Sequence, residues 1–385
     1  MIIGIITFHA SHNYGSMLQA WALQTYVQRL GHKVEIINFR TNKQRRIYPN
    51  PISLHLRGIK QFLLLLLFNP SALYPELKKW HKFEKFIKEE LSITKEYHTN
   101  SELSKIGHRY DVLICGSDQI WISCGDGDRA YFGNFLPVDV KKIAYAPSLG
   151  PYPFERIDRY YIQSNLKGFN ALSVREDIGK SFLESLFPSS LSLSHAFKDK
   201  VSDQRINVVC DPTLLLSSQD YEGISAPEDC APKGEYIFFY CLRPTPSLIK
   251  LANTVGEIYN LPVYTNRSFP PKKIKDYPMI QYWPAIGPKE FLTVINKSVA
   301  TCGDSFHLLV FSTIFHKKAY CLNDSTDSRI VNLLKRIDLE EMAVETRSDI
   351  ERCYKLFLDF DRIKEDLASY VNDSKRFLQE NLKSE

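Results

Sequence analysis

The sequence predicts an α/β protein made of two Rossmann-like, doubly wound domains that face each other across a cleft. The chain has 385 residues, and domains usually hold roughly 100–200 residues each. Apolar runs typical of buried parallel strands alternate with amphipathic helical patterns in both halves. We expect domains at 1–195 and 205–360, followed by a terminal helix at 361–385. Ligands of such folds bind beyond the carboxyl ends of the strands, so functional residues should follow strands.

The first half opens with a strand, a helix and a second strand. Residues 2–8 form an apolar run, residues 17–30 place apolar side chains on one helical face that stops at Gly31, and residues 34–39 form the next run. A crossover of this kind joins parallel strands. Residues 40–108 are basic and aromatic and predict a largely helical excursion from the sheet. Three further strands are expected at 111–115, 142–146 and 171–174.

A polar stretch at 188–204, rich in serine and lysine, separates the two halves, and we assign 208–212 as the first segment beyond it. The strand and helix patterns then alternate again. Strands are expected at 235–242, 262–264, 299–303 and 319–323, and helices at 246–260, 288–297 and 306–315. This alternation predicts the second doubly wound domain.

The composition excludes several classes of protein. The 44% hydrophobic and 24% charged residues are typical of soluble globular proteins. The net charge of +5 comes without a focused basic stripe, so we expect no nucleic-acid partner. The eight cysteines form no CxxC pair and several lie in apolar runs, which predicts no metal site and suits a reducing compartment. The N-terminus lacks the features of a signal peptide, so we expect a cytoplasmic protein.

One stretch, FLLLLLF at 62–68, is strongly apolar and is flanked by basic residues. It is far shorter than the roughly 20 residues that span a bilayer. Two interpretations stay open. It forms either a buried or domain-packing helix, or a patch that rests on the inner face of the cytoplasmic membrane.

The strongest candidate site is the segment TCGDSFHLLVFSTIF at 301–315, where a strand gives way to a polar turn and then to an apolar helix. The N–H groups of Ser305 and Phe306 would point out of the first helical turn and bind a phosphate or carboxylate. His307 would stand beside that anion. The alternative is a plain helix cap at Asp304 or Ser305 and a hydrogen-bonded core histidine.

Other strand ends carry comparable polar clusters. In ICGSDQIW at 114–121, Gly116 allows close backbone approach, and Asp118 would orient or deprotonate a sugar hydroxyl; a simple polar turn is the alternative. Arg175, in SVRED, would grip a carboxylate or phosphate, or form a salt bridge with Glu176 or Asp177.

The remaining candidates are weaker. In HASHNYGSM at 9–17, Asn13 and Gly15 suggest a ligand-binding turn, with Ser16 as a simple cap in the alternative. Arg329 is either an anion ligand or part of a surface pair. The full set of expected substrate-binding residues is Asn13, Gly15, Gly116, Ser117, Gln119, Ser148, Asp304, Ser305, Phe306 and Arg329.

Seven blocks, in order and over nearly the whole chain, resemble the polysaccharide pyruvyl transferase family. They are NYGSMLQAWALQ, DVLICGSDQIW, KIAYAPSLG, ALSVRED, VVCDPTLLL, CGDSFHLLVFS and SRIVNLL. The resemblance implies a GT-B-like fold, with the acceptor on the N-terminal side and the donor on the C-terminal side. It also implies transfer of a pyruvyl group from phosphoenolpyruvate to two hydroxyls of a sugar, which forms a ketal in a capsule or exopolysaccharide precursor that is often lipid-linked. No cofactor is implied beyond phosphoenolpyruvate as co-substrate.

By this resemblance His307 matches the family's essential histidine and Arg175 its essential arginine. We assign His307 as the acid that protonates the donor's methylene carbon, Arg175 as the anion clamp, and Asp118 as the base or sugar-orienting group. The chain departs from the family at Leu308, where glycine is usual, and at Pro147. We expect Leu308 to reshape the donor pocket. A GT-B glycosyltransferase that uses a nucleotide sugar, and a sugar- or phosphate-binding homologue without turnover, are the alternatives.

Overall fold

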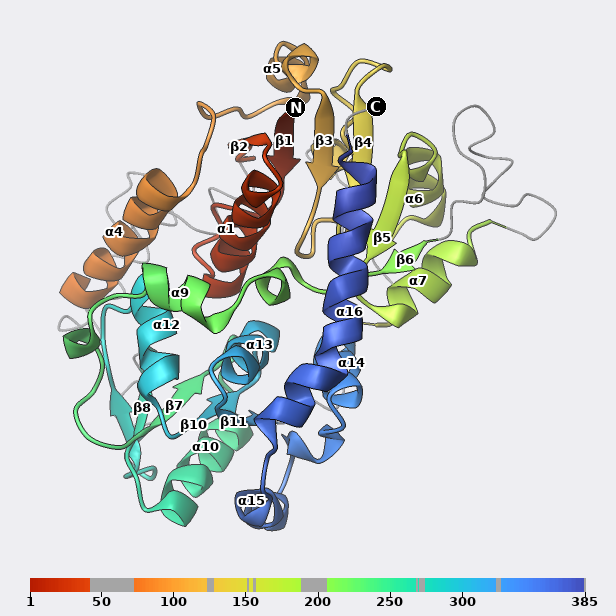
Figure 1. Cartoon of the computed structure of the whole chain (residues 1–385). Coiled ribbons are helices and arrows are strands. Elements are labelled where there is room, and N and C mark those ends of the chain that lie inside the picture. Colours follow the sequence, from red (N-terminus) through yellow and green to blue (C-terminus); the bar gives the residue numbers. More distant parts are fainter. Residues whose placement is uncertain are drawn as a thin grey trace. The chain divides into compact units, whose positions relative to one another are not determined.

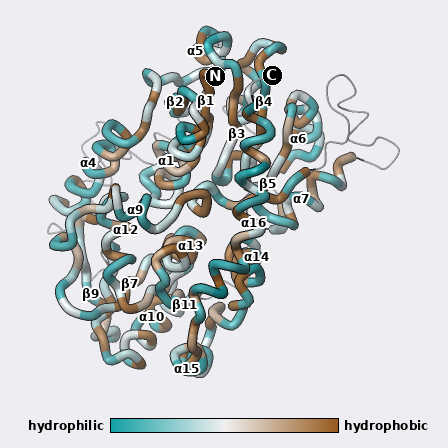
Figure 2. The backbone as a smooth tube through the Cα atoms, viewed as in Figure 1, coloured by the Kyte–Doolittle hydropathy of each residue, from teal (hydrophilic) through white to brown (hydrophobic). Residues whose placement is uncertain are grey.

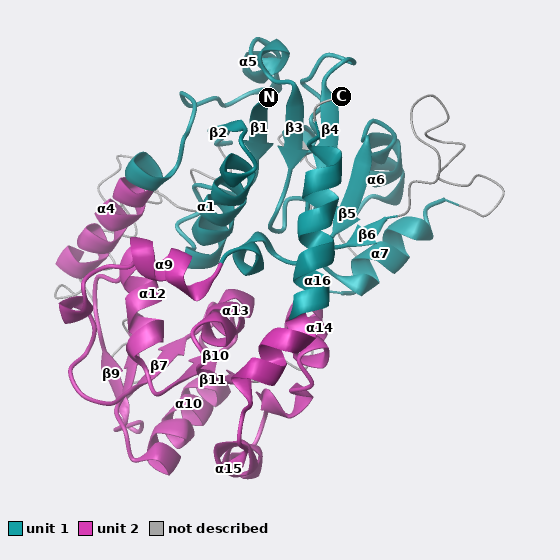
Figure 3. Ribbon diagram, viewed as in Figure 1, with its two compact units in different colours: residues 1–45, 87–216, 368–385 teal, residues 46–86, 217–367 magenta. Residues whose placement is uncertain are grey.

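The chain folds into two compact units (Figure 3). Unit 1 consists of Met1–Arg45, Ile87–Leu216 and Ala368–Glu385, and unit 2 of Arg46–Phe86 and Ser217–Leu367. The computed structural model describes residues 1–41, 73–122, 128–150, 152–154, 157–187, 206–267, 269, 274–322 and 327–383. The apolar stretch at 62–68 and the polar stretch at 188–204 lie outside the described residues.

Unit 1 contains a six-stranded sheet in which all neighbouring strands are parallel (Figure 1). Its order is β2-β1-β3-β4-β5-β6. The strands are β1 Ile2–Ile6, β2 Lys33–Ile36, β3 Val112–Cys115, β4 Lys141–Ala144, β5 Ala171–Val174 and β6 Asn207–Val208. The direction of winding reverses between β1 and β3, and the loops that diverge at such a switch point leave room for a ligand.

The crossover helix α1 (Tyr14–Arg29) leads away from this switch point. Asn13 caps it, since Oδ1 accepts hydrogen bonds from the N–H groups of Gly15 at 3.0 Å and Ser16 at 3.3 Å. Gly31, just beyond the helix, has φ +88°, a conformation that favours glycine. The other helical segments of unit 1 are α5 Asn100–Ser104, η2 Gly107–Arg109, η3 Asp128–Phe132, α6 Arg159–Leu166, α7 Asp177–Glu184 and η4 Pro212–Leu215.

Unit 2 repeats the same architecture with its own six-stranded parallel sheet, in the order β12-β11-β10-β7-β8-β9. Its strands are β7 Ile237–Tyr240, β8 Val263–Thr265, β9 Ile280–Tyr282, β10 Ala300–Gly303, β11 Lys318–Leu322 and β12 Ala343–Val344. Its helical segments are α9 Ser218–Ile224, η5 Glu228–Cys230, α10 Pro246–Tyr259, α12 Pro288–Lys297, α13 Phe306–Ile314, α14 Ser328–Arg336, η6 Glu340–Met342 and α15 Arg347–Lys355. The switch point of unit 2 lies between β7 and β10.

Among the helices that the structure describes, two contain residues of both units. Helix α4 (Leu73–Glu90) begins in unit 2 and ends in unit 1, and helix α16 (Phe360–Asn381) does the same near the end of the chain. Within the described part of the predicted helical excursion at 40–108, α4 and α5 are helical. The remaining part includes a segment that pairs with the end of β2, through bridges from Ile36 to Ile93 and from Phe39 to Tyr97.

Asn207–Val208 is the one segment that joins a different sheet from the one we expected. We assigned 208–212 to the second half, but β6 pairs with β5, with Val208 opposite Val174, and so extends the sheet of unit 1. A strand of two residues is too short to show a periodicity that would identify its sheet.

The strands form the apolar centre of each unit, and the helices carry both apolar and polar faces (Figure 2). In unit 1 the Trp121 ring stacks on Phe132 with centroids 5.1 Å apart, and Phe169 meets it edge-on. None of the described helices is long and apolar enough to cross a membrane.

Candidate functional site

The loop after β3 carries Asp118 at the switch point of unit 1. Gly116 precedes it with φ +138°, and a side-chain carbon at that position would lie only 1.9 Å from the carbonyl oxygen of Tyr145. Asp118 has φ +72°, a strained conformation for a residue other than glycine. The Ser16 hydroxyl, in the first turn of α1, donates a short hydrogen bond to Oδ2 of Asp118. The fold thus fixes a buried carboxylate against a hydroxyl from helix α1.

The side chains around Asp118 help to hold this loop in place. Ser117 Oγ donates to the carbonyl oxygen of Ala146 at 2.7 Å. The N–H of Ser148 donates to the Asp118 carbonyl oxygen at 2.9 Å, and the Ser148 hydroxyl accepts from a backbone N–H two residues further on. The N–H of Gln119 donates to Oδ1 of Asp118 at 2.8 Å. The structure therefore brings together Ser117, Asp118, Gln119 and Ser148 beyond the carboxyl ends of β3 and β4.

Arg175 follows β5 and is buried, with 2% of its surface exposed. Its Nε donates to Glu176 at 2.9 Å and its Nη1 donates to Asp211 at 2.5 Å. Burial alone would lower the pKa of the guanidinium, but the carboxylates of Glu176, Asp211 and Asp118 together raise the pKa. The salt bridge to Glu176, which the sequence left open, is present. Arg175 and Asp118 belong to one charged cluster in unit 1.

Neighbouring elements hold this charged cluster in place. Asp211 Oδ1 accepts hydrogen bonds from the N–H and the hydroxyl of Thr213, at 3.0 and 2.7 Å. The hydroxyl of Tyr370, on α16, donates to the carbonyl oxygens of Val209 at 2.8 Å and Arg175 at 3.3 Å. The last helix of the chain thus supports the backbone on both sides of the Arg175–Asp211 ion pair.

In unit 2, Asp304 joins the end of β10 to the loop after β7. Gly303 ends the strand where a side-chain carbon would lie 1.8 Å from the Tyr240 carbonyl oxygen, so only glycine fits. Asp304 Oδ1 accepts from the N–H of Leu242 at 2.6 Å, and Oδ2 accepts from the N–H of Arg243 at 3.3 Å. Burial raises the pKa of Asp304, although these hydrogen bonds act in the opposite direction.

Ser305 caps helix α13, as one of the two interpretations of the sequence had it. Its Oγ accepts from the N–H of Leu308 at 3.4 Å. The N–H groups of Phe306 and His307 lie in the first turn, where a helix has no internal acceptors for them and where its dipole is positive. The cap therefore leaves the start of α13 chemically suited to an anion.

Arg329 adds a positive charge at the first turn of α13. Its guanidinium lies 5.9 Å from the centre of the Phe306 ring, and its Nε and Nη2 donate to Asp327 at 2.9 and 2.6 Å. The rings of Phe306 and His307 meet edge-on at 5.1 Å. Both His307 and Phe306 are buried, with 7% and 5% exposed. Arg329, Phe306 and His307 form one cluster in unit 2, although they come from the first turns of two different helices, α14 and α13.

Arg267, which follows β8, is a residue of this region that the sequence interpretation missed. Its Nη1 donates to the carbonyl oxygens of Cys241 at 3.3 Å and Leu242 at 3.1 Å, and its charge lowers the pKa of Asp304. The available signal was a basic residue close to the end of a strand: Arg267 is the second residue after β8, and Arg175 is the first residue after β5.

The two departures from the family pattern both lie beside these clusters. Leu308 is buried against Gly303, with Cδ2 only 3.0 Å from where a side-chain carbon of that glycine would lie. Pro147 forms an isolated parallel β-bridge with Asp118. The carbonyl oxygen of Pro147 accepts a hydrogen bond from the N–H of Arg175 at 3.3 Å. Proline has no N–H to donate, and this position uses its carbonyl, so proline fits without loss of a hydrogen bond.

The predicted catalytic residues belong to both units, with Asp118 and Arg175 in unit 1 and His307 in unit 2. Asn13 and Gly15 also belong to unit 1, where their hydrogen bond forms the cap of α1. Over the described part of the chain, no group of three or more His, Cys, Asp or Glu residues is placed to hold a metal ion.

Solved structures similar to this chain share its two-unit architecture. UDP-GlcNAc 2-epimerase from Neisseria meningitidis bound to UDP-GlcNAc is 10% identical, with 99% of each chain covered and a TM-score of 0.55. UDP-GlcNAc 2-epimerase from Methanocaldococcus jannaschii is 11% identical, with 93% of each chain covered and a TM-score of 0.51. The glycosyltransferase AviGT4, involved in avilamycin A biosynthesis, is 9% identical, with 99% of this chain and 97% of its own covered and a TM-score of 0.51. These likenesses confirm the predicted GT-B-like class of fold.

The sequence itself identifies the family. None of the curated proteins matches the chain. The family model described as polysaccharide pyruvyl transferase matches residues 13–326, a span that includes Asp118, Arg175 and His307. Because this match covers most of the chain, the protein belongs to the polysaccharide pyruvyl transferase family.

Proposed function

We propose that this protein transfers the pyruvyl group of phosphoenolpyruvate to two hydroxyls of a sugar in a polysaccharide precursor and so forms a cyclic ketal. The observation that carries the proposal is the family match over residues 13–326. The chemistry of the two clusters supports it. The reaction needs an acid, a base and positive groups for a donor that carries both a carboxylate and a phosphate.

In the proposed reaction, a proton adds to the methylene carbon of phosphoenolpyruvate, which becomes a methyl group, and the oxygen of one sugar hydroxyl bonds to the central carbon. The bond from this carbon to the phosphate oxygen then breaks, and inorganic phosphate leaves with the electron pair. The oxygen of the second hydroxyl takes its place and closes the ketal. One of the two hydroxyl protons replaces the one that the acid supplied, and the other leaves with phosphate or solvent.

His307 is our candidate for the acid and the start of α13 for the donor's anionic groups. The imidazole lies in the first turn of the helix, next to the Phe306 ring. The Arg329 guanidinium lies over the Phe306 ring. The N–H groups of this turn and the helix dipole favour a phosphate or carboxylate. An anion held there would place its reacting carbon near the His307 ring.

Asp118 is our candidate for the base. Its carboxylate already accepts a hydrogen bond from the Ser16 hydroxyl, so a sugar hydroxyl is a chemically similar donor for it. We expected Arg175 to grip an anionic ligand, but its guanidinium is shared between Glu176 and Asp211. We therefore propose that Arg175 acts as a positioning residue that supplies a positive charge beside Asp118.

The acceptor in this proposal is a lipid-linked glycan, and the protein acts at the cytoplasmic face of the membrane. The support is chemical, because a precursor that is still being assembled exposes its free hydroxyls on the side where phosphoenolpyruvate is made. Comparing free and polyprenyl-phosphate-linked oligosaccharides as acceptors would separate the lipid requirement from the transfer itself.

The test of the proposal is acceptor-dependent release of inorganic phosphate from phosphoenolpyruvate, measured for the natural chain and two histidine variants. We expect His307→Gln to lower the rate by about a hundredfold to ten-thousandfold, as loss of a general acid does. The matched control is His316→Asn, since His316 is exposed beyond the other end of α13 and has φ +57°, which asparagine tolerates. A His307→Gln rate equal to that of the control would contradict the assigned role of His307.

A further inference from the structure

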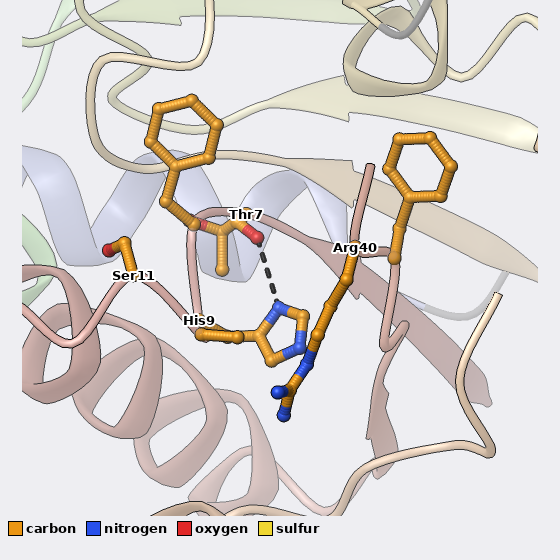
Figure 4. Close-up of a pocket in the computed structure, with 7 residues that line it drawn as sticks. Thr7, His9, Ser11 and Arg40 are labelled. Atoms are coloured by element: carbon orange, nitrogen blue, oxygen red, sulfur yellow. Dashed lines mark hydrogen bonds between the residues drawn. The ribbon is translucent and has the colours of Figure 1, made fainter. Parts of the chain in front are cut away.

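A small cavity opens at the carboxyl ends of β1 and β2 in unit 1, outside the residues assigned above (Figure 4). Its walls include Thr7, Phe8 and His9 after β1, and Phe39 and Arg40 after β2. Its volume of about 20 Å³ admits one small polar group, since a water molecule needs roughly 10–15 Å³ by the same measure. A whole sugar ring would therefore stay outside and insert one substituent.

The polar wall of the cavity is a hydrogen-bonded group of three side chains. The Nδ1 atom of His9 lies 3.2 Å from the carbonyl oxygen of Thr7, and its Nε2 lies 3.0 Å from Oδ1 of Asn38. The same Oδ1 accepts a hydrogen bond from Nε of Arg40 at 3.0 Å. Figure 4 shows the His9 ring and the Arg40 side chain next to each other.

This arrangement matches the charged form of His9 better than the neutral form. Both ring nitrogens face oxygen atoms, and a neutral imidazole carries only one N–H. If the Asn38 amide were flipped, its NH2 group could donate to Nε2 of His9. The same NH2 group would then face the N–H of Arg40 Nε, so that two donors would meet. Only the imidazolium donates to both oxygens. The charge of Arg40, however, disfavours a second positive charge on His9.

The surroundings of His9 lower its pKa overall, and burial is the largest cause. The charge of Arg40 also lowers the pKa, whereas the hydrogen bonds to Asn38 and Thr7 and the charge of Glu96 raise it. His98, whose Nδ1 lies 3.3 Å from the Arg40 carbonyl oxygen, is a further titratable group nearby. A carboxylate in the cavity would offset the Arg40 charge and permit the imidazolium that the hydrogen bonds require.

The apolar wall is held in place by the core of unit 1. Phe8 and Phe39 each meet Tyr131 edge-on, at 5.1 and 5.9 Å. The backbone of Arg40 is fixed by a hydrogen bond from its N–H to the carbonyl oxygen of Tyr97 at 3.0 Å. A few placed polar groups among aromatic side chains are typical of small-molecule sites.

We propose that this cavity is a subsite for the carboxylate of an acidic sugar in the acceptor, with Arg40 as its ligand and the His9 imidazolium as a second positive charge beside it. The inference rests on the proposed function only in taking that ligand to be an acceptor sugar. It adds a class of substrate, a glycan that contains a uronic acid. Arg40 pairs with the carboxylate, and His9 takes up a proton and donates to the Thr7 carbonyl oxygen and to Asn38.

The test measures binding rather than turnover, so its outcome is independent of pyruvyl transfer. Titration calorimetry compares D-glucuronate, D-glucose and phosphoenolpyruvate on the full-length natural chain and on Arg40→Gln, with Arg40→Lys as a charge-keeping variant. The matched control is Arg109→Gln, which removes the same charge from an arginine of unit 1 that is paired with Glu35 and does not line the cavity. The thermal midpoint of each variant shows whether it is folded.

We expect glucuronate to bind the natural chain about tenfold or more tightly than glucose, and Arg40→Gln to remove that preference. The Arg109→Gln variant should keep the preference for glucuronate over glucose, and Arg40→Lys should keep part of this preference. Glucuronate affinity should fall as the pH rises and His9 loses its proton, and His9→Gln should abolish this dependence. Equal binding of glucose and glucuronate would overturn the subsite. Binding of phosphoenolpyruvate that depends on Arg40 would assign the cavity to the donor instead.

Discussion

Asp304 holds together two loops at the edge of the sheet of unit 2. Its two carboxylate oxygens accept hydrogen bonds from the N–H groups of Leu242 and Arg243, while burial raises its pKa. A carboxylate that supports the backbone in this way is a structural group, next to residues to which we assign chemistry. Its ionisation should therefore be visible in the stability of the fold.

Replacing Asp304 by Asn should change how stability depends on pH. Because the pKa is raised in the folded protein, the unfolded chain loses its proton first as the pH rises above about 4. The folded state then binds more protons than the unfolded state, so the natural chain loses stability over this range. Asp304→Asn cannot ionise, so its thermal midpoint minus that of the natural chain should increase from about pH 4 to pH 7. A difference that stays constant with pH would show that Asp304 does not titrate with folding.

Single residues could be predicted where the local pattern contains the signal. Asp118, Ser305 and His307 lie a few residues beyond the ends of strands, and a polar residue at such a position can be found without knowledge of the rest of the fold. The contact between His9 and Arg40 depends on the adjacency of β1 and β2 and on the rotamers of both side chains. The geometry of Arg175 also depends on Asp211, which the sequence places after a different strand.

The joint between β10 and α13 is the element that the candidate site in unit 2 depends on most. Gly303 allows β10 to end against β7, and Leu308 packs over the same glycine from the helix. The leucine side chain thus fills the space beside Gly303. Leu308 lies within the joint, and its side chain supports the turn that presents His307.

Gly303→Ala should therefore destabilise unit 2. A methyl group there would lie 1.8 Å from the Tyr240 carbonyl oxygen, and backbone atoms cannot give way as a flexible side chain does. We expect a loss of about 3 kcal/mol, at the upper end for overpacked cores. Gly223→Ala is the matched control, because a side-chain carbon at Gly223 on α9 meets no atom within 4 Å. Urea unfolding of both variants decides the point, and equal midpoints would contradict the role of Gly303.

Most elements could be predicted because their patterns are long. Strand β5 and helix α12 have the predicted bounds, and the other strong runs differ by a few residues. Strands β9 and β12 were missed, because two or three residues show no period of their own. Such short strands are defined by their neighbours in the sheet.

At the scale of the whole molecule, the chain uses one fold twice. Each unit has a six-stranded parallel sheet with a switch point, and each has a glycine that ends a strand against a tyrosine carbonyl, Gly116 in unit 1 and Gly303 in unit 2. Because this contact between a glycine and a tyrosine carbonyl occurs in both units, a polar loop follows the strand at each switch point. Asp118 belongs to the loop in unit 1, and His307 lies in the first turn of α13, just beyond the loop in unit 2.

The assignment of segments to units is the part that sequence patterns predicted least. The amphipathic pattern of the last helix was evident, but a pattern does not show what a helix packs against. The second half of α16 contacts unit 1, where the Ser374 hydroxyl accepts from the N–H of Cys210 at 2.8 Å. Only the tertiary contacts show that the chain returns to the first sheet.

The central claim is that the donor is phosphoenolpyruvate, and a direct comparison of donors tests it. The natural chain is incubated with one uronic-acid-containing oligosaccharide and either phosphoenolpyruvate or UDP-glucose, and the products are analysed by mass spectrometry. We predict the mass gain of one pyruvyl ketal, with one phosphate released per ketal, from phosphoenolpyruvate alone. A hexosyl mass gain from UDP-glucose, with no ketal from phosphoenolpyruvate, would contradict the claim.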